Sequence, residues 1–144
     1  MSVTEEMLTF AEKIKPEFCC FVPENREELT TEGGLDVVSQ LSKIQESCIR
    51  LREAGIRVSL FIDADENQIN AAAQSFAPYI EIHTGHFANL VKSKKNYSNE
   101  LKRIKKSSIL ANKLGLEVHA GHGLDYKTTR LLTKIREIEE FNIG

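Results

Sequence analysis

Two side chains, Glu81 and His122, occupy positions from which they could carry acid–base chemistry. Glu81 interrupts the short apolar run Tyr79–His83, and His122 follows the run Glu117–Ala120. A carboxylate within an apolar strand is costly unless it is paired or hydrated, so a polar group or ligand must face Glu81. An imidazole titrates near neutral pH and can donate or accept a proton. Together the two residues predict proton transfer.

Two glycine-containing loops are candidates for binding phosphate. Gly121-His122-Gly123 lies between an expected strand and an expected helix, where glycine allows close approach and the helix start attracts anions. Thr30-Thr31-Glu32-Gly33-Gly34 offers hydroxyls and amides before another helix. On the pattern alone, an ordinary capped turn is the favoured interpretation of this second loop. The Ile143-Gly144 end is a further candidate, because barrels often bind phosphate after their seventh and eighth strands.

Other polar residues have simpler interpretations. Asp63 and Asp65 are both candidates for a helix N-cap, and a cap is the favoured interpretation of Asp63. His83 either donates to a neighbouring carbonyl or faces the site. The pairs His83/His86 and His119/His122 suggest zinc or iron ligands. A three-residue step at a strand end turns the second ring away from the first, which argues against a metal.

Alternating strands and helices position these residues. The sequence predicts strands at Phe18–Val22, Val58–Ile62, Tyr79–His83, Glu117–Ala120 and, just beginning, Phe141–Gly144. It predicts helices at Leu35–Ala54, Ile69–Phe76, about Asn99–Leu114 and Tyr126 to about Ile138, with a first helix capped by Ser2 and Glu5. This order implies βαβ units and a parallel sheet, and no linker divides residues 1–144, so we expect one domain.

The strand pattern favours a barrel over an open sheet. Strands buried on both faces are continuously apolar, whereas Tyr79, Glu81 and His83 share one face opposite Ile80 and Ile82. A polar inner face and an apolar outer face suit a (β/α)8 barrel with its site at the carboxyl ends of the strands. Such barrels need about 250 residues, so we expect the chain to be an incomplete part of one.

Composition excludes several classes of protein. The 144 residues carry a net charge of −2, with 41% hydrophobic and 28% charged residues, which indicates a folded, water-soluble chain. No apolar run is long enough to span a membrane, and we expect no signal peptide. The charge balance argues against nucleic-acid binding, and the lysines at 92, 94, 95, 102, 105 and 106 predict a solvated face. Three cysteines without paired spacing suit the cytoplasm.

Four segments resemble a known family. Residues 21–37, FVPENREELTTEGGLDV, are similar to the signature of pyridoxine 5′-phosphate synthase, the ring-closing enzyme of vitamin B6 synthesis. Val58–Asp63, Ile80–Gly85 and Ala120–Leu124 are similar to three further family segments, in the family's order. The resemblance covers essentially the whole chain.

The resemblance implies a (β/α)8 barrel of which this chain supplies the middle-to-late units, about five strands. The implied reaction condenses 1-deoxy-D-xylulose 5-phosphate with 3-amino-2-oxopropyl phosphate, without metal or organic cofactor, in a homo-octamer. By position, Thr30 would bind the deoxyxylulose phosphate, Glu81 would stabilise the transition state and His122 would donate a proton. Gly123 and Gly144 would bind the aminoketone phosphate.

Some family residues have no counterpart here. The family places a catalytic Glu immediately before the segment matching Met1-Ser2-Val3, and a second proton acceptor, a His, on an earlier strand. We therefore expect that residues 1–144 alone neither close the barrel nor turn over substrate. Two alternatives remain open from the sequence: a metal-dependent barrel hydrolase using His83 and His119, and an inactive phosphate-binding fragment.

Overall fold

Five parallel strands form one sheet whose spatial order follows the sequence. The computed structural model describes residues 1–30 and 32–144. The strands are β1 (Phe18–Phe21), β2 (Arg57–Ile62), β3 (Tyr79–His83), β4 (Glu117–Gly121) and β5 (Ile138–Asn142), paired as β1-β2-β3-β4-β5. In a doubly wound sheet the order of the strands reverses at a switch point. The order here shows no reversal, which confirms the α/β fold and the expected arc of a barrel.

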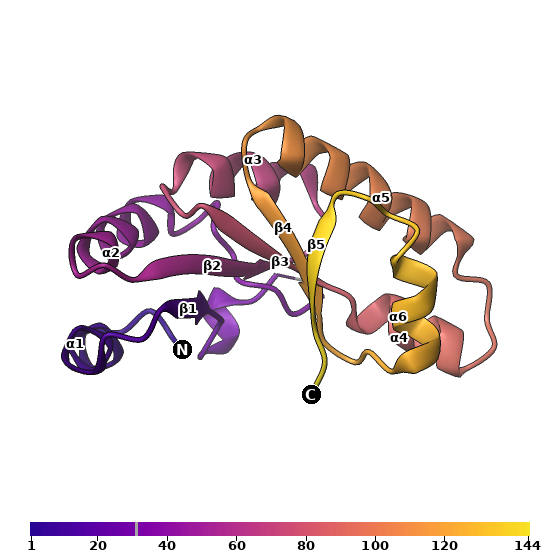
Figure 1. Ribbon diagram of the computed structural model, residues 1–144, viewed down its shortest axis with the longest axis horizontal. Helices are drawn as coiled ribbons and strands as arrows, with labels where there is room; N and C mark the ends of the chain where they lie inside the picture. Colours follow the sequence, from indigo (N-terminus) through magenta and orange to yellow (C-terminus); the bar gives the residue numbers. More distant parts are fainter. Residues whose placement is uncertain (31) are drawn as a thin grey trace.

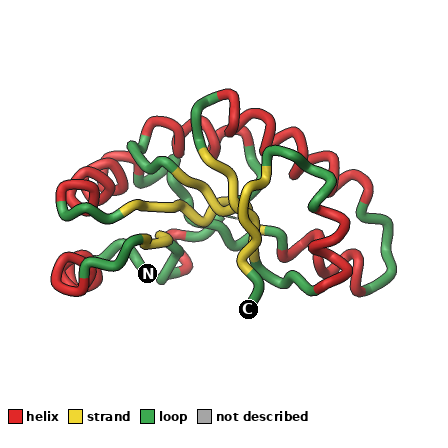
Figure 2. The backbone as a smooth tube through the Cα atoms, in the orientation of Figure 1, coloured by secondary structure: helices red, strands yellow, loops and turns green. Residues whose placement is uncertain are grey.

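Helices lie along the outside of the sheet. They are α1 (Glu5–Ile14), α2 (Leu41–Glu53), α3 (Glu66–Gln74), α4 (Gly85–Lys92), α5 (Ser98–Lys113) and α6 (Tyr126–Leu132), with a short 3-10 turn at Arg26–Glu28. In Figure 1, α2, α3 and α5 follow one another around the sheet, and Figure 2 shows the strands on the inner side of this arc. No helix among the described residues has the length and apolar character needed to cross a membrane.

The strands divide their side chains between a dry outer layer and a polar inner face. Ile80 and Ile82 of β3 are fully buried, as are Leu60 and Val118 on the neighbouring strands. Burying such a side chain contributes about 1.5–3 kcal/mol, so this layer stabilises the sheet against its helices. The alternate β3 positions, including Glu81, lie on the other face and are only partly buried. The predicted alternation is confirmed for β3, whereas on β2 and β4 the inner-face residues Ser59 and His119 are buried as well.

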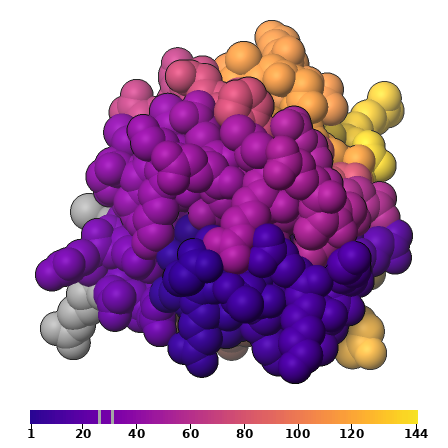
Figure 3. All heavy atoms as spheres, turned by 90° about the vertical axis from the view of Figure 1, so that its left-hand side faces the viewer, coloured from indigo at the N-terminus to yellow at the C-terminus, as the bar shows by residue number. Residues whose placement is uncertain are grey.

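The first two helices are joined by an arginine. Arg50 of α2 donates to Glu5 over 2.8 Å and to Glu12 over 2.7 Å, both on α1. Figure 3, in which the left side of Figure 1 faces the viewer, shows α1 (indigo) packed directly beneath the magenta and purple chain. These contacts hold the first helix against the outside of the arc.

The predicted start of the second helix is wrong by six residues. We expected Leu35–Ala54, but α2 begins at Leu41. The side-chain oxygen of Gln68 accepts hydrogen bonds from the Val37 and Val38 amides, at 2.8 and 3.3 Å, and holds a turn there. Leu35 and Val37 are fully buried, as residues on the inner side of a helix would be, whereas Val38 is half exposed.

Four other element predictions need correction. The first helix is capped by Thr4, whose hydroxyl accepts from the Met7 amide, and not by Ser2. The expected loop after β3 contains α4, whose eight residues bury Phe87 and Val91. The sixth helix ends at Leu132, and the fifth strand begins at Ile138 because that residue pairs with Val118.

Candidate active site

Glu81 and His122 line the same open hollow. It has a volume of about 470 Å³ on the inner face of the sheet and is also lined by Met1, Cys20, Val22, Pro23 and Phe61. Glu81 comes from the middle of β3, and His122 follows the end of β4. The predicted convergence of these two residues is therefore found in the structure. An acid–base pair with this arrangement can serve one bound ligand.

Contacts from two strands hold the Glu81 carboxylate. Asn142 of β5 donates to Glu81 Oε2 over 2.8 Å, and the Cys20 thiol of β1 lies 3.8 Å from the same oxygen. Burial raises the pKa of Glu81 above its ordinary value, although the hydrogen bonds from Asn142 and Cys20 and the nearby His119 oppose the rise. The raised pKa lies closer to neutral pH, where a carboxyl group can take up and release protons during catalysis.

Gly121 provides the space that Glu81 occupies. A Cβ atom added to Gly121 would lie 2.0 Å from Glu81 Oε1 and 2.9 Å from its Cδ. No side chain fits there while the carboxylate keeps its position. The first glycine of the predicted phosphate loop therefore has a different local task, which is to admit the carboxylate.

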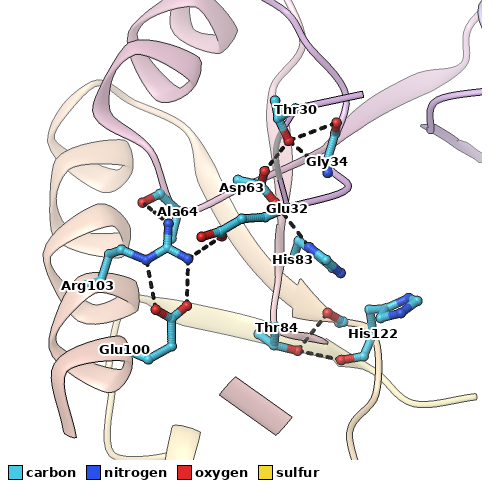
Figure 4. Close-up of polar contacts among 11 residues, drawn as sticks. Thr30, Glu32, Gly34, Asp63, Ala64, His83, Thr84, Glu100, Arg103 and His122 are labelled. Atoms are coloured by element: carbon cyan, nitrogen blue, oxygen red, sulfur yellow. Dashed lines mark hydrogen bonds and ion pairs between the residues drawn. The ribbon is translucent and has the colours of Figure 1, made fainter. Parts of the chain in front are cut away.

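His122 has a strained backbone that Thr84 stabilises. Its φ of 81° lies in the left-handed region, which is uncommon for residues other than glycine. The buried Thr84 hydroxyl contacts the carbonyl oxygens of Gly121 and His122, at 2.6 and 2.9 Å (Figure 4). The Thr84 amide also donates to the Gly121 carbonyl over 2.8 Å. The end of β3 thus fixes the turn that presents His122.

Replacing Thr84 by valine is expected to lower the free energy of unfolding by about 1–3 kcal/mol, because the buried hydroxyl that contacts the Gly121 and His122 carbonyls is lost. Turnover should fall with it, since the turn that carries His122 loses its support. Denaturant unfolding and steady-state kinetics measure the two effects. Thr84→Ser retains the hydroxyl and serves as the control; if both variants behave alike, the hydroxyl has no such role.

Thr30 lies in a tight loop beside the end of β2. Its hydroxyl donates to Asp63 and accepts from the Gly34 amide over 3.1 Å, and its own amide donates to the Gly34 carbonyl over 2.9 Å. A Cβ atom on Gly34 would lie 2.5 Å from the Asp63 backbone nitrogen, so only glycine fits this approach. The favoured interpretation as a turn is correct for the backbone, while the hydroxyl is drawn toward the site. Thr31, also part of the predicted cradle, lies outside the described residues.

The prediction that Asp63 caps a helix is wrong. Asp65 caps α3, accepting from the Asn67 and Gln68 amides. Asp63 continues the inner face of β2, and its Oδ1 lies 3.1 Å from His83 Nδ1. Burial alone would raise the pKa of Asp63, but the hydrogen bonds from His83 and Thr30 outweigh it and lower the pKa.

This shift predicts how the contribution of Asp63 to stability depends on pH. Because its folded-state pKa lies below the ordinary 3.8, the ionised group stabilises the fold above that pH, and the contribution is lost as the pH falls through the folded-state pKa. The difference in unfolding free energy between the wild type and Asp63→Asn should be largest at neutral pH and shrink below pH 3.8. Urea unfolding across this range measures it, and a difference that persists in strong acid would contradict it.

The two glycines expected to bind the second phosphate occupy different surroundings. Gly123 has a φ of 74°, and a Cβ atom on it would lie 3.2 Å from Ala88 Cβ on α4. Lys92 of α4 donates to the Gly123 carbonyl over 2.6 Å, which places a cation beside this loop. Gly144 is exposed, and a Cβ atom on it would meet nothing within 4 Å. The described contacts do not bring Gly144 against Gly123.

The histidines do not assemble as metal ligands. Across residues 1–30 and 32–144, no three His, Cys, Asp or Glu side chains group as a metal site. His119 contacts Glu117 over 3.3 Å and lies 3.8 Å from Glu140. His83 pairs instead with Asp63, which follows β2. His86 is exposed on α4. The metal interpretation of His83 and His119 gains no support from this geometry.

Comparison with known proteins identifies the family. The model of the pyridoxal phosphate biosynthesis protein PdxJ family matches residues 1–144. The chain belongs to this family. It is 57% identical over 144 residues to the Pyridoxine 5′-phosphate synthase of Colwellia psychrerythraea. All of this chain is aligned, but it spans only 58% of that relative's length. The resemblance predicted from the four sequence segments is confirmed.

A solved structure supports the fold of this PdxJ chain. The chain is similar in structure to the Xylose isomerase domain protein from Planctomyces limnophilus, with a TM-score of 0.61 and 14% sequence identity. The match covers 100% of this chain and 60% of the Planctomyces chain. At this identity the likeness concerns the fold alone. It agrees with the sequential strand order and the outer helices.

Three contributors to the candidate site were missed in the sequence. Asn142 supports Glu81, and Thr84 supports His122. Arg103 pairs with Glu100 of its own helix α5 and joins that helix to the Thr30 loop through Glu32 (Figure 4). The contact of Asn142 depends on the register of β5, in which Asn142 pairs with Gly121, and spacing alone does not give that register. Thr84 and Arg103 act through loop contacts that spacing does not reveal.

Proposed function

We propose that this chain is part of a pyridoxine 5′-phosphate synthase. The reaction would condense 1-deoxy-D-xylulose 5-phosphate with 3-amino-2-oxopropyl phosphate and release pyridoxine 5′-phosphate, inorganic phosphate and water. The observation that carries the proposal is that Glu81 and His122 line one open hollow of about 470 Å³ in a chain of this family. The name of the Colwellia relative supports the same reaction.

In this proposal His122 and Glu81 divide the proton and charge work. Ring closure eliminates oxygen substituents, and each elimination needs a proton delivered to the leaving oxygen. His122, exposed at the mouth of the hollow, would deliver it. Glu81, held by Asn142 and Cys20, would stabilise the positive charge that develops on the substrate. Burial and the neighbouring carboxylate raise the pKa of Cys20 to about 12, so its thiol stays protonated.

The family resemblance supports the proposed substrate contacts. Thr30 would bind the deoxyxylulose phosphate, while the backbone amides of Gly123 and Gly144 would bind the phosphate of the aminoketone. The cation of Lys92 beside the Gly123 carbonyl favours an anion there. Holding two substrates in one orientation lowers the barrier by several kcal/mol.

We further propose that the protein works in the cytoplasm as a homo-octamer and needs neither a metal nor an organic cofactor. Family resemblance supports these statements. Light scattering of the purified full-length protein measures the number of subunits, and activity after treatment with a chelator tests the need for a metal.

The reaction is tested by incubating the purified full-length protein with both substrates and detecting pyridoxine 5′-phosphate by mass spectrometry. We expect one inorganic phosphate released for each product molecule, and no product when either substrate is omitted. Binding of the phosphate esters without product would instead support a phosphate-binding protein. Activity that disappears with chelator and returns with zinc would support a metal-dependent enzyme.

A further inference from the structure

We propose that Asp63 and His83 are positioning residues that hold the Thr30 hydroxyl and the His122 ring in one arrangement. The inference rests on the proposed function, because it takes Thr30 as a substrate-binding residue and His122 as the proton donor. The two residues lie at the ends of neighbouring strands, Asp63 directly after β2 and His83 at the end of β3. Neither has a place in the proton transfers described above.

The first step is the double use of the Asp63 carboxylate. Its Oδ2 accepts from the Thr30 hydroxyl, and its Oδ1 lies 3.1 Å from His83 Nδ1. The side chain is 4% exposed, so water does not compete for these bonds. An ionised carboxylate only accepts hydrogen bonds, so Nδ1 of His83 must carry the proton. Asp63 therefore orients both the hydroxyl and the imidazole (Figure 4).

The second step is the contact between the two imidazoles. The rings of His83 and His122 lie 4.8 Å apart, centroid to centroid, with 66° between their planes. A Cβ atom on Gly85 would lie 2.7 Å from His83 Nε2 and 2.9 Å from His122 Cδ2. The rings can approach only because residue 85 is glycine. With the His83 ring held by Asp63, the His122 ring has an oriented surface to pack against.

The third step is the connection between distant segments. Thr30 follows β1, Asp63 follows β2, His83 ends β3 and His122 follows β4. A displacement of the Thr30 loop is therefore transmitted through a carboxylate and one ring to the proposed acid. An aspartate that only capped a helix, or a histidine that only filled the core, would not connect Thr30 with His122 in this way.

Two substitutions of His83 separate the two halves of this arrangement. His83→Asn keeps a donor near Nδ1 but removes the ring, whereas His83→Phe keeps a ring and removes the donor. We expect His83→Asn to lower kcat about tenfold or more with KM little changed, and His83→Phe to raise KM for deoxyxylulose phosphate about tenfold, the size associated with losing a hydrogen bond to a charged group. Asp63→Asn should show both effects. His86→Asn, an exposed position on α4, is the control.

A measurement independent of turnover accompanies the kinetics. In ¹⁵N-histidine-labelled full-length protein, His83 should show a protected Nδ1–H signal that disappears in Asp63→Asn, and His83→Asn should shift the His122 ring signals. A His83 ring protonated only at Nε2, or His83 variants with wild-type kcat and KM, would overturn the proposal. If the wild type forms no pyridoxine 5′-phosphate, the proposed function fails, while the labelled spectra still decide whether Asp63 and His83 position His122.

Discussion

Replacing His122 by asparagine is expected to lower kcat of the full-length enzyme by about a hundredfold or more, the range typical of losing a general acid. KM should change little, because the proton is delivered in the transition state and the substrate contacts remain. Steady-state kinetics with both substrates measures the split. Asparagine is a suitable replacement because it tolerates the φ of 81° at this position better than most side chains do, so the backbone of the turn should be kept.

The control for this substitution is His86→Asn, which changes an exposed histidine on α4 in the same way. It should leave kcat and the melting temperature at wild-type values. If His122→Asn also retains full turnover, His122 is not the proton donor, and another group at the hollow must supply the proton.

The substitution Gly121→Ala is expected to abolish most of the activity while leaving the fold largely intact. The new Cβ atom would lie only 2.0 Å from Glu81 Oε1, so the two atoms would overlap. The main clash involves the end of a flexible side chain, so the carboxylate can move away, while Asn142 Cβ, 3.0 Å from the new atom, must shift by a few tenths of an ångström. We expect kcat to fall about a hundredfold, comparable to removing one electrostatic contact to a transition state, with little change in the melting temperature.

The Gly121→Ala effect can be traced to Glu81 with a double-mutant cycle. If the alanine acts by displacing the carboxylate, adding it to Glu81→Gln should cost little further activity, because the interaction is already lost. Independent, additive losses would contradict this explanation. A large fall in the melting temperature of Gly121→Ala would show that the fold, and not the carboxylate alone, depends on the glycine.

The positions of the strands could be predicted because each is a short apolar run with alternating faces. The same alternation placed Glu81 on the inner face. The helix α4 could not be predicted in this way, because its eight residues are too few to display a clear period, and burial of Phe87 and Val91 stabilises it. The start of α2 depends on hydrogen bonds that the Val37 and Val38 amides donate to Gln68, a residue outside that segment.

The sequence predicts that the two main residues of the candidate site converge, but it does not predict the contacts that support them. The convergence of Glu81 and His122 follows from the rule that parallel strands end at one rim. Asp63 was misjudged because an aspartate before a helix suits a cap equally well, and only the position of Asp65 decides between them. The support from Asn142 requires the register of β5, which the last residues of the sequence do not specify.

The alternation along β3 has a consequence for how this chain tolerates change. Ile80 and Ile82 face the helices and are fully buried, whereas Glu81 lines the hollow and His83 lies on the same inner face. Substitutions at even positions should chiefly reduce the amount of folded protein in cells, and those at odd positions should spare the amount and reduce catalysis. Stability and chemistry can therefore evolve almost independently within a single strand, one residue apart.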